Sequence, residues 1–212
     1  MNNLLYKEFK LTISPFYFVL PALLGALILI PQWLFFLVPL YFCFITVPNL
    51  FAAYKAQNDL SFSVMMPVSK SNIVKAKLLS IMTLELVHVI FAAIFAVLNK
   101  VLYNTENLFF NPNVAFIGLI FVMFGIFNLV LFPMFYKTGY KYGAAVIVST
   151  ISAFLFVAAM ELSVVFNKKA AVFFETDVNR QLAILALGLI MFLAMSYIAY
   201  KISLKRFKKV DV

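Results

Sequence analysis

The chain has 212 residues, of which 65% are hydrophobic and only 12% charged, and its formal net charge is +9. A soluble domain carries about 25% charged residues, so this composition excludes an ordinary soluble enzyme or binding module. It predicts an all-α integral membrane protein, because helices satisfy their own backbone hydrogen bonds in lipid.

The first segment, residues 1–14, is expected to form a short interfacial amphipathic helix. Leu4, Leu5 and Phe9 share one helical face, and the charged side chains point elsewhere: Lys7, Glu8 and Lys10. The simpler alternative is a basic flank that only fixes the orientation of the chain. No small-residue cleavage site follows, so we expect no cleavable signal peptide.

The next stretch predicts two membrane spans. Residues 11–54 form a charge-free run of 44 residues, which as a helix would be about 66 Å long, twice the ~30 Å hydrocarbon core. Pro31, Gln32 and Trp33 supply a natural turn with an interfacial aromatic side chain. We therefore expect spans at about 13–30 and 33–54. The single Cys43 lies in the second span and is expected to pack in the core, without a disulfide or a metal cluster.

A polar loop at 55–77 separates this pair from the rest of the chain and is interpreted as a docking element. Asn58 or Asp59 can start a helix by capping its first free amides, and an acidic residue there complements the helix dipole; Pro67 ends the helix. Between them lie more apolar side chains than a solvated loop needs: Leu60, Phe62, Val64, Met65 and Met66. The alternative is that these side chains fold against the membrane interface or the base of the bundle.

Four further spans are expected by the same criterion of length and hydropathy, at about 78–98, 112–135, 143–166 and 182–200. Six spans in one transmembrane domain, 1–212, leave no room for a second domain. With both termini inside, 13 of the 17 Lys and Arg residues fall on the cytoplasmic side. This distribution explains the net charge by topology and by anionic lipid, and it does not favour nucleic-acid binding.

The layout resembles the membrane (permease) subunit of a type-2 ABC exporter, and is similar to small bacterial peptide exporters of the phenol-soluble-modulin type. The motif-level likeness covers residues 55–78, with Asn58-Asp59, the apolar cluster 60–66, Pro67 and the lysine-containing return 68–77. Met65-Met66 departs from the family, where leucines and a serine are more usual. The resemblance implies a cytoplasmic coupling helix that docks on the ATPase through Asn58, Asp59, Leu60, Phe62, Met65, Met66 and Pro67.

The resemblance also implies the partners and the setting. These are an ABC ATPase subunit, a second membrane subunit (identical or closely homologous), the lipid bilayer and an amphipathic peptide substrate, in a bacterial cytoplasmic membrane. The chain has no GxxxxGK[ST] phosphate loop, so ATP and Mg would bind to the partner ATPase. No cofactor and no metal are expected on this chain.

Two ionisable residues inside the third span are candidates for the translocation path. Glu85 and His88 are three residues apart, hence on one helical face. They could meet a charged or amphipathic substrate, or Glu85 could instead pair with His88 or bond a neighbouring helix. Glu161 is expected near the outer end of the fifth span, and Asn128 is expected to hydrogen-bond between helices.

Other classes of function stay open at this point. A metalloprotease needs paired histidines and a carboxylate, and this chain has one histidine, so we expect no enzymatic activity. The stronger alternatives are a small multispan immunity or scaffold protein, or a proton-coupled carrier that uses Glu85 and His88. A carrier of that kind usually shows internal repeats, and none is convincing here.

Overall fold

The computed structural model describes residues 2–103, 107–138, 141–175 and 177–210, and every regular element in them is a helix. The first half contains short helices: α1 Asn2–Lys7 with a π-helical turn Glu8–Thr12, α2 Phe16–Gly25 with a 3-10 turn Ala26–Leu29, α3 Leu37–Tyr41, a π-helical turn Phe42–Thr46, α4 Val47–Ala56 and α5 Asp59–Met65. The second half contains α6 Lys70–Tyr103, α7 Val114–Thr138, α8 Gly143–Phe166, α9 Lys168–Glu175 and α10 Val178–Phe207.

Five helices in the described residues are long and apolar enough to cross a membrane: Leu37–Ala56, which joins α3 and α4, and α6, α7, α8 and α10. The predicted first span, 13–30, corresponds to the shorter apolar helix Phe16–Leu29. At ~1.5 Å per residue this helix is about 21 Å long, less than the ~30 Å hydrocarbon core. By length and composition, the part of the chain that the structure describes thus contains five candidate membrane spans and one shorter apolar helix.

The observed helix bounds agree with the spans predicted from hydropathy, except where a helix continues beyond its apolar stretch. The predicted fifth span, 143–166, has the same bounds as α8. In contrast, α6 begins at Lys70 and ends at Tyr103, so the last eight residues of the predicted 55–77 loop are helical. The sequence of α6 contains neither Gly nor Pro, so nothing stops the helix at the end of its apolar part.

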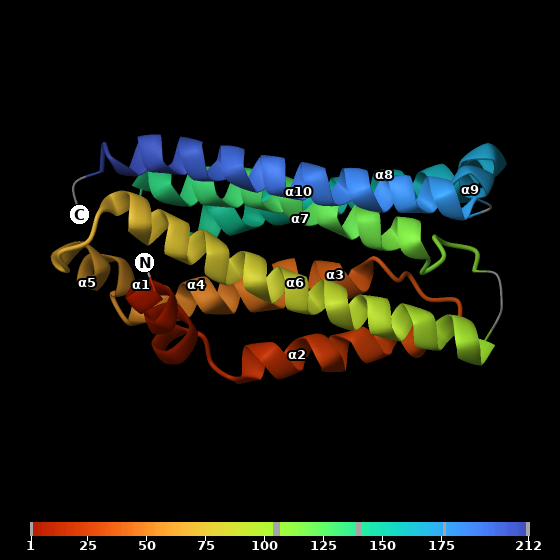
Figure 1. Cartoon of the computed structure of the whole chain (residues 1–212), viewed down its shortest axis with the longest axis horizontal. Helices are drawn as coiled ribbons and strands as arrows, with labels where there is room; N and C mark the ends of the chain where they lie inside the picture. The colour runs from red at the N-terminus through yellow and green to blue at the C-terminus, as the bar shows by residue number, and fades with distance from the viewer. Residues whose placement is uncertain (1, 104–106, 139–140, 176, 211–212) are drawn as a thin grey trace.

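The helices form an elongated bundle with α7 at its centre. Of the five candidate spans, α7 is the most buried; it packs against α8 and most extensively against α10. The longest helix, α6, crosses the bundle and contacts α2 on one side and α7 and α10 on the other (Figure 1). The closest approach is at Gly118 and Gly188, where a Cβ atom on Gly188 would lie 2.1 Å from the Gly118 carbonyl oxygen.

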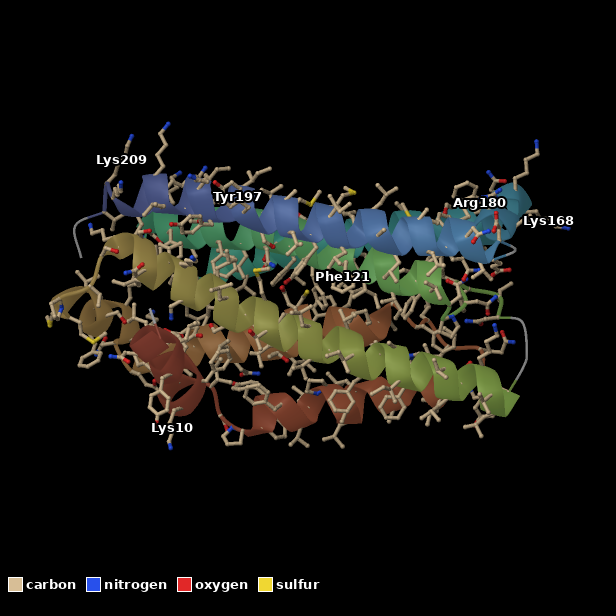
Figure 2. All side chains as sticks on the ribbon, viewed as in Figure 1. Lys10, Phe121, Lys168, Arg180, Tyr197 and Lys209 are labelled. Atoms are coloured by element: carbon tan, nitrogen blue, oxygen red, sulfur yellow. The ribbon has the colours of Figure 1, made fainter. Side chains whose placement is uncertain are left out.

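The two ends of the bundle differ in composition and contacts. At one end, here called the α5 end, α1, α5 and the C-terminal end of α10 lie together (Figure 1), and the Lys70 ammonium donates to the Val210 carbonyl at 2.7 Å. At the other, the α9 end, the loop after residue 106 is held by polar contacts, including Asn111 to Glu175 at 2.6 Å. Lys10 and Lys209 lie at the α5 end, and Lys168 and Arg180 at the α9 end (Figure 2).

Candidate functional site

The short helix α5 has two different faces. Phe62 is 56% exposed and Met65 is 85% exposed, and their spacing of three residues places them on the same side of the helix. Asp59 and Ser63, four residues apart, are buried on the opposite side. The helix therefore presents an apolar surface outward while its polar side chains face the bundle.

A buried cluster of four charges anchors this inner face. It consists of Lys7, Glu8, Asp59 and Lys77, here called the ion cluster. The Asp59 carboxylate accepts from the Lys7 ammonium through Oδ1 and from Lys77 through Oδ2 at 2.7 Å. Glu8 lies between the same two cations, with N–O distances of 3.1 Å to Lys7 and 3.7 Å to Lys77. Two positive and two negative charges thus neutralise each other away from water, as buried charges require.

Contacts to uncharged side chains extend the ion cluster. Lys7 also donates to the Ser63 hydroxyl at 2.7 Å, and the Lys77 ammonium lies 3.1 Å from the centroid of the Tyr54 ring, a cation–π contact. Since Tyr54 belongs to α4 and Lys77 to α6, the cluster joins α1, α4, α5 and α6 at a single point. A displacement of α5 must therefore act on all three of its neighbours or break buried ion pairs.

The charge states of the cluster follow from these contacts. Burial alone would raise the pKa of the Asp59 carboxyl, but Lys77 and Lys7 outweigh it and hold that pKa below its usual value of 3.8. Burial would likewise lower the pKa of the Lys7 ammonium, but Glu8 and Asp59 raise it above 10.5. Both groups are consequently charged at neutral pH.

This arrangement corrects the sequence-based picture of the N-terminal segment. Lys7 and Glu8 are buried, not turned to water as the amphipathic pattern predicted. The reason is that Lys7 and Glu8 lie three and four residues after the buried Leu4, on the same helical face, and that Asp59 and Lys77 supply counter-charges there. Leu4 is buried as expected.

The predicted docking residues separate into distinct environments. Phe62, Met65, Asn58 and Pro67 are exposed; Leu60 and Met66 are half-buried, and Asp59 is buried in the ion cluster. Asn58 precedes the helix in the left-handed region, at φ 49°, and its side chain makes no capping hydrogen bond to the described residues. The expected helix start at Asn58-Asp59 is thus confirmed, but Asn58 does not cap it through its side chain; Pro67 follows the helix end directly after Met66.

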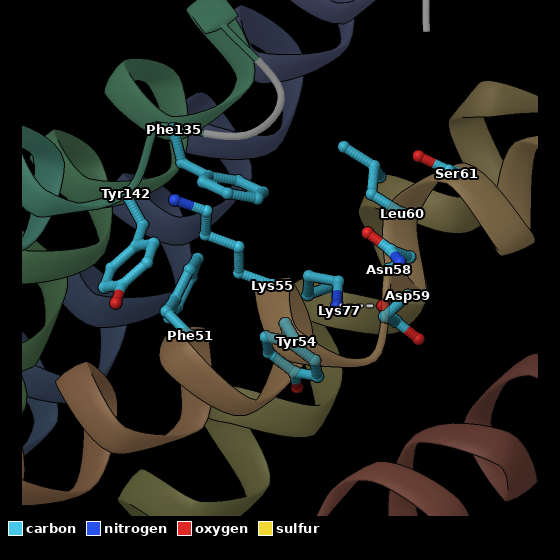
Figure 3. Close-up of a pocket in the computed structure, with 10 residues that line it drawn as sticks. All are labelled: Phe51, Tyr54, Lys55, Asn58, Asp59, Leu60, Ser61, Lys77, Phe135 and Tyr142. Atoms are coloured by element: carbon cyan, nitrogen blue, oxygen red, sulfur yellow. Dashed lines mark hydrogen bonds and ion pairs between the residues drawn. The ribbon is translucent and has the colours of Figure 1, made fainter.

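A cavity of about 240 Å³ lies behind α5, between that helix and the ends of α4 and α7. Figure 3 shows its lining, and the side chain of Lys55 runs toward the rings of Phe135 and Tyr142. The lining residues are Phe51, Tyr54, Lys55, Asn58, Asp59, Leu60, Ser61, Lys77, Phe135 and Tyr142.

Glu85 and His88 lie inside the bundle, away from both ends. Glu85 is 1% exposed and accepts from the Asn128 amide of α7 at 2.9 Å, which confirms the interhelical hydrogen bond expected for Asn128. His88 is also buried; its Nδ1 lies 3.0 Å from the Leu84 carbonyl, and its ring packs against Phe42. A role for the two residues in the translocation path stays a prediction.

Glu161, expected near the outer end of its span, accepts from the Phe110 backbone N–H at 2.9 Å. It thereby ties α8 to the loop that precedes α7. Among the described residues, no three His, Cys, Asp or Glu side chains gather in a way that could hold a metal ion.

Sequence reasoning did not find the partners of Asp59. The pattern puts Lys7 on the polar side of the N-terminal helix and Lys77 in the lysine-containing return, and it gives Ser63 no role. Lys77, however, directly adjoins the apolar part of α6 and therefore needs a counter-charge or a path to water. The position of Lys77 could therefore have indicated a buried ion pair. The cation–π contact of Tyr54 could not be predicted, because nothing in the local sequence marks an aromatic ring as the partner of a lysine.

Comparison with known families agrees with this architecture. Residues 3–208 match the family model described as ABC-2 family transporter protein, which covers almost the whole chain. The chain belongs to the ABC-2 transporter family. No curated protein and no solved structure matches it.

Membership of the ABC-2 family has direct consequences. The protein is a multi-pass membrane protein and the permease subunit of an ABC transporter, a subunit that is ordinarily non-catalytic in this family. This confirms the expectation of a type-2 ABC permease and favours it over the immunity, scaffold and carrier alternatives. The closer likeness to phenol-soluble-modulin exporters stays a prediction.

Proposed function

We propose that this ABC-2 permease couples ATP hydrolysis by a separate ATPase subunit to export of hydrophobic or amphipathic peptides. The observation that carries the coupling role is the two-faced helix α5. Its outer face exposes Phe62 and Met65, and its inner face is held by the ion cluster. Exposed apolar side chains on an anchored helix suit a partner surface, and methionine adapts readily to one.

In this proposal the ion cluster transmits motion of the ATPase to the bundle. A force on α5 reaches α6 through Asp59 and Lys77 and reaches α1 through Lys7. Because paired buried charges separate only at a cost of several kcal/mol, α5 moves together with these helices. ATP and Mg would bind to the ATPase, and the membrane complex would contain two permease subunits.

The orientation and the substrate class belong to the same proposal. The α5 end carries 13 of the 17 basic residues, which supports a cytoplasmic position of this end and of both termini under the positive-inside rule. The 26 Phe and 10 Tyr residues suit a path for amphipathic peptides, and a bacterial cytoplasmic membrane suits exporters of this type.

The test is co-purification of the permease from its native membrane in mild detergent, followed by identification of the associated proteins. We expect a stoichiometric ATPase with a phosphate-binding loop. Phe62→Asp and Met65→Asp should each abolish its retention while the purified variants keep the melting temperature of the wild type. The matched control is Leu108→Asp, because Leu108 is similarly exposed but lies at the α9 end. Equal ATPase retention by all three variants would remove α5 as the docking helix.

A further inference from the structure

The cavity behind α5 carries an uncompensated positive charge. Two of its charged residues, Asp59 and Lys77, neutralise each other in the ion cluster. The third, Lys55, is exposed, and no hydrogen bond or ion pair joins its ammonium to any residue that the structure describes. An occupant of this cavity is therefore favoured if it is anionic.

The walls of the cavity are mostly aromatic and apolar. Phe51, Phe135 and Tyr142 come from α4, from α7 and from the residue before α8, and Leu60 comes from α5. At about 240 Å³ the space far exceeds the roughly 10–15 Å³ that one water needs. A small inorganic anion would leave these apolar walls in contact with water, whereas an amphiphile would cover them.

The position of the cavity also suits a lipid. Phe51 and Lys55 lie in the last two turns of α4, Phe135 in the last turn of α7, and Tyr142 next to the first residue of α8. Three apolar helices thus end around it, as expected at a membrane boundary. Aromatic and basic side chains together at such a boundary are characteristic of contact with anionic headgroups.

We propose that this cavity binds the headgroup of an anionic phospholipid, with the phosphate at Lys55 and the adjoining glycerol and acyl carbons along Phe51, Phe135 and Tyr142. Under the proposed orientation the lipid comes from the cytoplasmic leaflet. Since Asn58, Leu60 and Ser61 of α5 form one wall, a bound lipid also ties α5 to α4 and α7. The lipid-binding step does not depend on an ATPase, whereas an effect of the lipid on coupling rests on the proposed function.

The experiment measures lipid binding to the full-length permease in detergent, without an ATPase, by native mass spectrometry and by thermal stabilisation. The probes are phosphatidylglycerol, phosphatidylcholine and inorganic phosphate. We expect selective retention of phosphatidylglycerol, with affinity lowered roughly fivefold in Lys55→Gln, the loss expected for one lysine at a membrane surface. Lys55→Arg should restore binding, and Lys209→Gln, which removes an exposed lysine at the same end, should change affinity less than twofold.

Two results would overturn the proposal. Equal weakening by Lys55→Gln and Lys209→Gln would mean that the lipid is attracted only by the diffuse positive charge of the α5 end. Stabilisation by inorganic phosphate that matches phosphatidylglycerol and is lost in Lys55→Gln would identify a site for soluble anions. Because no ATPase is present, either result is distinguishable from a failure of the proposed coupling role.

Discussion

Asp59 is the side chain on which the α5 end depends most, since it is the common partner of two buried lysines. Replacing it by Asn leaves Lys7 and Lys77 with only Glu8 as a nearby carboxylate. We expect a loss of about 3–5 kcal/mol in the free energy of unfolding, the cost of breaking a buried pair. Thermal unfolding of the purified variant measures this loss.

Two further variants control this prediction. Asp177→Asn removes an exposed ion pair with Arg180 at 3.9 Å but keeps a side chain able to cap α10, and should cost less than about 1 kcal/mol. The double variant Asp59→Asn/Lys77→Met should be more stable than Asp59→Asn alone, because it removes the stranded cation. If Asp59→Asn unfolds at the same temperature as Asp177→Asn, the ion cluster does not stabilise the fold.

The pKa directions of Asp59 and Lys7 predict how this stabilisation changes with pH. The pKa of Asp59 is lower in the folded state, so its contribution is complete above pH 3.8 and is lost as the pH falls further. The pKa of Lys7 is raised, so its contribution is complete below pH 10.5 and is lost above it. The stability difference between wild type and Asp59→Asn should be constant from about pH 5 to 9 and shrink in stronger acid. A difference that already falls between pH 7 and 5 would contradict this assignment.

Glu85 and Asn128 form the central polar contact of the bundle and allow a second residue-scale prediction. Asn128→Leu removes the hydrogen-bond donor to Glu85 and should lower the free energy of unfolding by about 1–3 kcal/mol. Glu85→Gln keeps an acceptor oxygen for Asn128 and differs only in being unable to ionise, so it should cost less. A change in transport by Glu85→Gln at unchanged melting temperature would instead support a role in the translocation path.

Single residues were the least predictable level. The amphipathic pattern correctly placed Leu4 in the interior but wrongly turned Lys7 and Glu8 to water. Their partners are distant in sequence: Asp59 lies 52 positions after Lys7, and Lys77 lies 69 positions after Glu8. Asp59 was recognised as important near a helix start, yet its partners could not be read from local spacing. Long-range pairing of charges requires the fold, whereas the burial of an apolar side chain does not.

At the scale of elements, the contact between α7 and α10 depends on two glycines that let the backbones approach closely. A methyl group at Gly188 would collide with the Gly118 carbonyl, so Gly188→Ala should separate the helices and cost about 1–3 kcal/mol. The control is Gly143→Ala, where the added methyl meets no described atom within 4 Å. This variant should be neutral or up to about 1 kcal/mol more stable, because alanine favours the helix. Equal melting temperatures for the two variants would disprove the role of the close approach.

Elements were more predictable than residues. Hydropathy alone placed α8 to the residue and α7 within a few residues, because the ends of these helices coincide with the ends of their apolar stretches. It misplaced the start of α6, where Lys70 and Lys75 continue the helix in polar surroundings. It placed the end of the first span within one residue of Leu29 but its start three residues too early, because Ile13 is extended and Pro15 directly precedes the helix.

At the scale of the whole molecule, the unequal distribution of basic residues predicts which end of the bundle faces the cytoplasm. Cys43 is the single, buried cysteine, so the wild-type chain should not react with a membrane-impermeant maleimide. In intact cells, the variant Phe173→Cys, near the α9 end, should be labelled. The variant Met65→Cys should be labelled only after the membrane is permeabilised. The reverse pattern would invert the proposed topology and with it the assignment of α5 to the ATPase.

The length of α6 has a mechanical consequence. From Lys77 to Tyr103 the helix runs about 39 Å at ~1.5 Å per residue, and its sequence offers no Gly or Pro hinge at which it could bend. A tilt of about 5° applied at the ion cluster would therefore move Tyr103 by roughly 3 Å on purely geometric grounds. The Asn99 side chain, near that far end, is bonded to the Ile28 carbonyl at 2.6 Å, so the short apolar helix beside it would be carried along. Under the proposed coupling role, α6 would act as a stiff lever that carries motion from the ion cluster to the α9 end of the bundle.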